Sequence, residues 1–137
     1  MTAFLDTNVL IDVLNGKRQA IQRYQSESDS GRRMVVSALV AHELMFGALI
    51  SGRPDHHAKE ARLLLADLEI IDWAASDAFA AARLRTQLRA LGEPIGSFDA
   101  LIAGQAINHG WTLVTANTRE FSRVEGLALE NWSLEGA

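Results

Sequence analysis

The sequence of 137 residues contains no cysteine. This absence excludes disulfides, thiolate metal sites and cysteine nucleophiles, and it fits a reducing cytoplasm as the location. The N-terminal residues show no basic segment followed by an apolar core, so we expect no signal peptide. No apolar run approaches the roughly 18 residues of a membrane span, so no membrane partner is expected.

Lysine is also scarce, with two Lys against eleven Arg. A mechanism that depends on a catalytic lysine is therefore disfavoured. The four histidines, His42, His56, His57 and His109, lack the spacing of an HExxH zinc motif. The sequence has no P-loop, no GxGxxG turn and no GxSxG elbow, which disfavours the chemistries that these motifs serve.

The remaining composition is that of an ordinary globular protein, with 48% hydrophobic and 22% charged residues. The formal net charge of −4 has the wrong sign for a protein that simply coats nucleic acid. No repeat or linker divides the chain, and its length is typical of one domain. We therefore expect a single domain over residues 1–137.

Short apolar runs alternate with helical patterns along the chain. Strands are predicted at 3–5, 34–36, 69–73 and 112–115, with a short edge strand at 127–129. Helices are predicted over 9–14, 20–26, 38–50, 54–68, 77–91 and 98–108, with Asn8, Ser37, Ser76 and Ser97 as N-caps. This alternation predicts an α/β three-layer sandwich with a central, mostly parallel sheet of four to five strands.

Ligands of such sheets bind beyond the carboxyl ends of the strands. Asp6, Thr7 and Asn8 directly follow the first strand, either as part of a site or as a helix-capping turn. Glu43 interrupts a helix that is apolar nearly all round, so we expect it to be buried. A buried carboxylate needs an Arg partner, a shifted pKa or a metal ion, and a buried salt bridge is the alternative to a functional role.

Asp99 falls in the first turn of a helix, where the helix dipole alone stabilises an anion by roughly 0.3–1 kcal/mol. Thr115, Asn117 and Glu120 follow the last long strand. Together these groups place several carboxylates and amides at one edge of the sheet. Clustered carboxylates repel one another unless a cation lies between them, and oxygen-only ligands favour Mg²⁺ or Mn²⁺.

These residues form motifs that resemble a known family. The run Phe4–Asp12 resembles the opening of PIN-domain ribonucleases, Ser37–Glu43 resembles their second acidic motif, and Gly96–Ala103 resembles the third. Leu113–Phe121, with Val124–Leu127 and Glu130–Trp132, is similar to the C-terminal signature of VapC-type toxins. The resemblance spans the whole chain, in order.

The resemblance implies a Mg²⁺-dependent endoribonuclease, the toxin of a type II VapBC toxin–antitoxin pair, with Mn²⁺ as an alternative ion. Asp6, Glu43 and Asp99 match the family's three acidic positions, where Asp6 and Asp99 would ligate the metal directly and Glu43 directly or through water. Thr7, Asn8, Ser97 and Thr115 match supporting polar positions. Asn117 stands at the fourth acidic position of many members, and Glu120 is a candidate for the missing charge.

The implied partners are a structured RNA, for which a tRNA is plausible, and a VapB-type antitoxin. The apolar helix 38–50 suggests a homodimer, assembled into a heterotetramer or a larger complex with the antitoxin. Arg85, Arg89 and Arg119 are candidates for phosphate contacts, with solvated helix faces as the alternative.

Two other functions compete with this interpretation. A catalytically degenerate PIN fold would act only as a binding and repressor subunit with its antitoxin. A haloacid-dehalogenase-like phosphatase also begins with a strand and Asp-x-Asp, but here the third residue is Asn8. Only Lys17 and Lys59 are available as its lysine, and neither follows a late strand.

Overall fold

The computed structural model describes residues 1–133, which form five strands and seven helices. The strands are β1 (Ala3–Leu5), β2 (Met34–Ser37), β3 (Glu69–Ile71), β4 (Thr112–Val114) and β5 (Leu129–Glu130). They form one sheet in the order β3-β2-β1-β4-β5, and every pair of neighbouring strands is parallel. The predicted parallel sheet is therefore confirmed.

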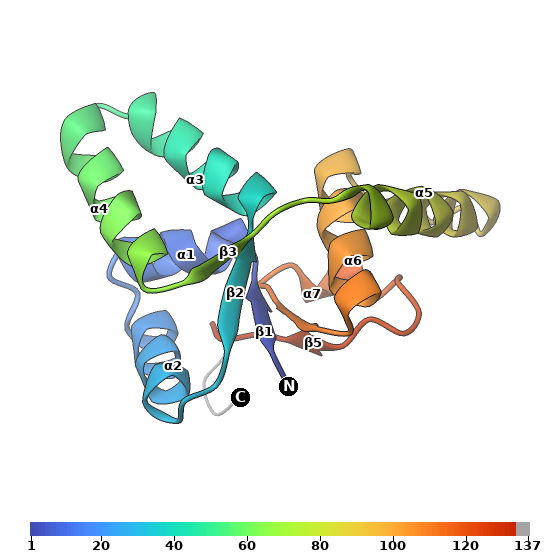
Figure 1. Ribbon diagram of the computed structural model, residues 1–137, viewed down its shortest axis with the longest axis horizontal. Helices are drawn as coiled ribbons and strands as arrows, with labels where there is room; N and C mark the ends of the chain where they lie inside the picture. Colours follow the sequence, from blue (N-terminus) through green and yellow to red (C-terminus); the bar gives the residue numbers. More distant parts are fainter. Residues whose placement is uncertain (134–137) are drawn as a thin grey trace.

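Helices cover both faces of this sheet. They are α1 (Thr7–Leu14), α2 (Arg18–Asp29), α3 (Ala38–Leu49), α4 (Pro54–Ala66), α5 (Ala75–Ala90), α6 (Ser97–His109) and α7 (Thr118–Phe121). Figure 1 shows α1 to α4 on one side of the strands and α5 to α7 on the other. This arrangement confirms the three-layer sandwich. Within residues 1–133, no helix combines the length and the apolar character that crossing a membrane requires.

The strand order reverses between β1 and β4, which lie side by side in the middle of the sheet. From β1 the chain moves outward to β2 and β3, and from β4 it moves outward to β5 in the opposite direction. The two connections diverge and leave a crevice at the carboxyl ends of β1 and β4. Leu5 pairs with Val114, and Asp6 N donates to Val114 O at 2.9 Å. The residues that follow both strands therefore border one crevice.

The strands are apolar on both faces because both faces of the sheet are covered. Phe4, Val35 and Leu113 are fully buried. On α6, Ala100, Ile102, Ala103 and Ala106 are equally buried and complete the core beneath the crevice. The helix that carries Asp99 is thus held along its length by packing rather than by its N-terminal turn alone.

Helix α6 packs closely against α5 through Gly104. A Cβ added at Gly104 would lie 2.6 Å from the Cα atom of Ala81 and 2.7 Å from its Cβ and N atoms. These distances are far shorter than real contacts, and two of the three atoms belong to the backbone. The absence of a side chain at Gly104 therefore sets the separation of α5 and α6.

A buried carboxylate ties the same two helices together. Asp77 is completely buried, and its oxygens accept hydrogen bonds from Ala74 N at 2.8 Å, Gln105 Nε2 at 3.2 Å and Asn108 Nδ2 at 2.9 Å. His109 Nε2 lies 3.2 Å from Asp77 Oδ1. Burial of this carboxylate is offset by four polar partners, which fix α6 against the start of α5.

Three of the four predicted helix caps are wrong. Asp6, not Asn8, caps α1, because its extended backbone lets its carboxylate accept from Thr7 N. Ser76 already lies inside α5, whose N-cap is Ala74, and Asp77 bonds that residue's N–H instead. Ser97 is the first residue of α6, and the N-cap is Gly96.

The cap at Ser37 is confirmed, since Leu39 N donates to Ser37 Oγ at 3.1 Å. The predicted edge strand also exists but begins later, because Leu129 rather than Leu127 pairs with Leu113. The strand predicted at 69–73 ends at Ile71, where pairing with β2 ends.

Candidate active site

Asp6 lies at the centre of the crevice and is only 5% exposed. Its Oδ1 accepts from Thr7 N at 2.9 Å, and its Oδ2 accepts from Thr115 Oγ1 at 2.9 Å and Asn8 Nδ2 at 3.2 Å. Burial raises the pKa of Asp6, the three hydrogen bonds oppose that rise, and the charge of Glu43 adds to it. The hydrogen bonds also fix the direction of both carboxylate oxygens.

Asn8 and Thr115 link the two strand ends around this carboxylate. Asn8 Nδ2 donates to Thr115 Oγ1 at 3.2 Å, and Asn8 Oδ1 accepts from Ala116 N at 3.1 Å. Thr115 Oγ1 also accepts from Asn117 N at 3.1 Å. The loops after β1 and β4 are therefore joined by side chains that are more than 100 residues apart in sequence.

Asp99 enters the crevice from the first turn of α6. The pKa of Asp99 is raised to about 6, first by burial and then by the negative charges of Asp6, Glu120 and Glu43. At neutral pH the carboxylate is thus ionised against the repulsion of its neighbours. This electrostatic arrangement favours a cation among these side chains.

Glu43 comes from α3 and is exposed, which corrects the expectation of a buried carboxylate. Although α3 is apolar nearly all round, only Val40 and Leu44 of this helix are buried. Glu43 therefore needs no buried partner. It still lines the same hollow as Asp6 and Asp99.

This hollow, the candidate catalytic hollow, has a volume of about 370 Å³. Thr7, Asn8 and Ser97 line it together with the three carboxylate residues, as do Ile11, Gly96 and Phe98. The hydroxyl of Thr7 is buried and has no hydrogen-bond partner. The structure thus gathers six of the nine sequence-predicted site residues around one hollow, and Thr115 contacts Asp6 from behind it.

Asn117 and Glu120 do not line the hollow but support its rim. Asn117 Nδ2 donates to Glu120 Oε2 at 3.0 Å, and Gly96 N donates to Glu120 Oε1 at 2.8 Å. These hydrogen bonds, from Asn117 first and then from Gly96, lower the pKa of Glu120. Glu120 therefore fixes the N-terminal end of α6 and adds negative charge near Asp99.

The side chains around the hollow suit a hard divalent cation, because the atoms that could ligate a metal are oxygens and the carboxylates repel one another. Among the residues that the structure describes, no three Asp, Glu or His side chains are close enough to hold one ion together. Mg²⁺ is often bound by one or two carboxylates, with water and substrate phosphate completing its shell. The side chains present fit that mode: Asp6 and Asp99 would hold such an ion, and Glu43 would contact it directly or through water.

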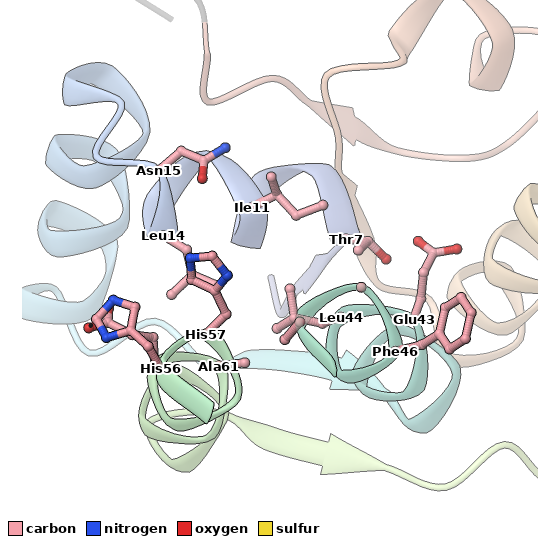
Figure 2. Close-up of a pocket in the computed structure, with 13 residues that line it drawn as sticks. Thr7, Ile11, Leu14, Asn15, Glu43, Leu44, Phe46, His56, His57 and Ala61 are labelled. Atoms are coloured by element: carbon pink, nitrogen blue, oxygen red, sulfur yellow. Dashed lines mark ion pairs between the residues drawn. The ribbon is translucent and has the colours of Figure 1, made fainter. Parts of the chain in front are cut away.

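A larger groove of about 550 Å³ adjoins the hollow and shares Thr7, Ile11 and Glu43 with it. Figure 2 shows Thr7 and Glu43 at one end of this groove and His56 and His57 of α4 at the other. This groove was not predicted from the sequence. Its signal was the apolar surface of α3, which leaves Phe46 57% exposed.

Comparison with known proteins gives consistent results. The sequence model of the PIN domain matches residues 3–127. The tRNA(fMet)-specific endonuclease VapC of Shigella flexneri is 35% identical over 94% of this chain and 96% of its own length. Ribonuclease VapC2 of Rickettsia felis is 35% identical over 96% of this chain and 98% of its own length.

The same fold occurs in solved structures. VapBC2 from Rickettsia felis, bound to a DNA fragment from its promoter, contains a chain that superposes with a TM-score of 0.90 at 34% identity, covering 96% of this chain and 99% of that one. VapBC from Salmonella typhimurium, also DNA-bound, gives a TM-score of 0.87 at 30% identity over 96% and 98%. These matches exclude the alternative of a haloacid-dehalogenase-like phosphatase. The chain belongs to the PIN-domain family and, within it, to the VapC group.

Proposed function

We propose that this chain, acting as one domain over residues 1–137, is a metal-dependent endoribonuclease and the toxin of a VapBC pair in the cytoplasm. The observation that carries the proposal is that Asp6 and Asp99 line one hollow, at the place in the sheet where the strand order reverses between β1 and β4. The relatives named as VapC endonucleases support the reaction class. VapC nucleases of this family are generally metal-dependent, and the donors here favour Mg²⁺, with Mn²⁺ as the alternative.

A divalent ion, when bound, supplies an activated water and stabilises charge on the phosphoryl oxygens. The chain's own residues prepare the place for it. Asp6 is held by Thr7, Asn8 and Thr115, so its oxygens need no reorientation when substrate arrives. Asp99 is ionised above about pH 6 and adds the second charge. Hydrolysis of the RNA strand leaves a 5′-phosphate and a 3′-hydroxyl.

The substrate is a structured RNA, and initiator tRNA is the first candidate. Two relatives with at least 33% identity over more than nine tenths of this chain are named for tRNA(fMet). Gly96 and Ser97 line the catalytic hollow and are exposed, so a protruding loop of a folded RNA can reach this side of it. Such a loop has the accessible backbone that cleavage requires.

The protein partner is a VapB-type antitoxin, because the neighbouring solved structures are VapBC complexes. We propose that the antitoxin places a cation, an Arg, among Asp6, Glu43 and Asp99, which neutralises the carboxylates without metal. The exposed apolar side chains Phe46, Leu49 and Ile50 on and after α3 favour a homodimer, and hence a heterotetramer or larger assembly with the antitoxin.

The test is brief induction of the chain without antitoxin, followed by sequencing of RNA 5′ ends, with purified protein assayed on initiator tRNA in parallel. The wild type should arrest growth and cut RNA, and EDTA should abolish cleavage in vitro. Asp99→Asn keeps the shape but removes a charged ligand, so it should lose both activities. Asp29→Asn, at the exposed end of α2, is the matched control and should retain them.

A degenerate subunit that only binds DNA with its antitoxin predicts a different result. Wild type and Asp99→Asn would then be equally harmless, and no new RNA 5′ ends would appear. Cleavage that survives both EDTA and Asp99→Asn would instead contradict the metal mechanism while leaving the ribonuclease activity in place.

A further inference from the structure

Helix α5 carries three arginines, and two of them, Arg85 and Arg89, lie one turn apart on the same face. Both side chains are exposed. In the part of the chain that the structure describes, neither forms an ion pair with an acidic residue. Their positive charges are therefore available to a ligand.

The two arginines border a second hollow, of about 390 Å³. Thr86 and Leu88 of the same helix also line it, as do Pro94 and Ile95 from the segment that follows α5. The chain then runs directly from Ile95 into Gly96–Asp99, which line the catalytic hollow. The two hollows thus lie along one continuous segment of backbone.

This segment is fixed at two points rather than free to move. Arg123 Nη1 donates to Pro94 O at 3.0 Å, and Gly96 N donates to Glu120 Oε1 at 2.8 Å. Both bonds come from α7 and the residues just after it. The segment that connects the hollow beside Arg85 and Arg89 with the hollow beside Asp99 is therefore held in place, as the positioning of a substrate requires.

The charge distribution of the protein explains why RNA would need arginines close to the catalytic hollow. The protein has a net charge of −4, and its catalytic hollow contains three carboxylates, so a polyanion is repelled unless positive charge lies nearby. Arg32 binds Glu130 and Arg33 binds Glu69, so these cations are already neutralised. Arg also grips phosphate through two parallel hydrogen bonds.

We propose that Arg85 and Arg89 bind backbone phosphates of the RNA on one side of the scissile bond, and so position the strand at Asp99. This inference rests on the proposed ribonuclease function and names the residues that hold its substrate. It assigns to α5 contacts that are independent of base identity, because phosphate is common to every nucleotide.

The test measures binding of a fluorescein-labelled initiator tRNA transcript by anisotropy, in the Asp99→Asn background so that the RNA stays intact. Arg85→Gln with Arg89→Gln should weaken binding roughly tenfold at about 0.1 M salt. The slope of log affinity against log salt should fall by about 1.4 for two lost contacts to single-stranded phosphate. Arg85→Lys with Arg89→Lys should restore the salt dependence but only part of the affinity, because Lys binds phosphate as a point charge without the second parallel hydrogen bond.

The matched control is Arg53→Gln with Arg62→Gln, which removes the same charge from exposed positions at the start of α4 and along it. Helix α4 lies on the opposite side of the sheet from α5 (Figure 1). This control should keep affinity within about twofold of the parent. Equal losses in the two pairs, or no loss in the α5 pair, overturn the proposal.

Cleavage assays separate this proposal from the function on which it rests. With Asp99 restored, the α5 glutamine pair should raise KM roughly tenfold and change kcat less than about twofold, since the contacts lie away from the reacting atoms. A wild-type chain that leaves all RNA intact overturns the ribonuclease function itself. A wild-type chain that cleaves, with an α5 pair that behaves like the α4 control, overturns only the positioning role.

Discussion

Thr115 Oγ1 donates a hydrogen bond to Asp6 Oδ2 at 2.9 Å and thereby joins the ends of β4 and β1. Thr115→Val keeps the shape of the side chain but leaves that oxygen, among residues 1–133, with Asn8 as its remaining side-chain donor. The pKa of Asp6, already raised by burial, should rise further. We expect kcat/KM to fall roughly tenfold at pH 7 and to recover partly at higher pH. Thr115→Ser retains the donor and should stay close to wild type, and a deficit that is independent of pH would contradict this account.

Asp99 should weaken the folded state at neutral pH. Its pKa is raised to about 6, so folding favours the protonated form, and the ionised carboxylate destabilises the protein above that pH. Without divalent metal at pH 7.5, Asp99→Asn should therefore raise the free energy of unfolding by roughly 1 kcal/mol, because solvent screens part of the repulsion. This corresponds to about 4 °C in Tm. The gain should vanish near pH 4, where wild-type Asp99 is largely protonated. Thermal unfolding at both pH values checks this, and Asp29→Asn should show no comparable dependence.

Glu120 should control the pH range of the reaction rather than the existence of the site. Its charge contributes to the raised pKa of Asp99, and Glu120→Gln removes that charge while its amide oxygen still accepts from Gly96 N. The acid limb of cleavage should therefore move to lower pH, and Mg²⁺ binding should persist. Single-turnover rates between pH 5 and 8, with isothermal titration of Mg²⁺, provide the measurement. Complete loss of metal binding would make Glu120 a direct ligand.

Among the glycines of residues 1–133, Gly104 should be the one at which an added side chain costs most stability. Gly104→Ala forces a Cβ to 2.6 Å from the Ala81 backbone, so α5 and α6 must separate. We expect a loss of about 2–3 kcal/mol in the free energy of unfolding, measured by urea denaturation. Gly47→Ala, also within a helix but with no atom within 4 Å of the added Cβ, is the control and should be neutral or stabilising. Equal effects of the two variants would show that helix separation is not limited at Gly104.

The sequence allowed Asp6 and Asp99 to be placed because their signals are local. Asp6 directly follows a buried strand, and Asp99 stands in the first turn of an apolar helix. The bond from Thr115 to Asp6 could not be foreseen, since it joins residues 109 positions apart and no periodicity encodes it. The same holds for the bond from Gly96 to Glu120.

The prediction that Glu43 is buried is wrong, because an apolar helix is not necessarily a buried one. Helix α3 pairs with α4 as an arm that extends from the sheet (Figure 1), so its outer face meets solvent or a partner. Phe46 and Leu49 remain more than half exposed on that face. A helix that is apolar all round indicates either a core or an interface, and the sequence alone does not distinguish them.

The buried Asp77 makes the active site depend on a side chain that is closed off from solvent. Asp77 binds Gln105 and Asn108 in the second half of α6, whereas Asp99 projects from its first turn. Because α6 is one continuous helix, a displacement of its C-terminal half also displaces Asp99 at its N-terminal end. A substitution of Asp77 would therefore reduce catalysis although every catalytic side chain is still present. A genetic screen for variants that no longer arrest growth should recover substitutions of Asp77 as readily as substitutions of the active-site carboxylates.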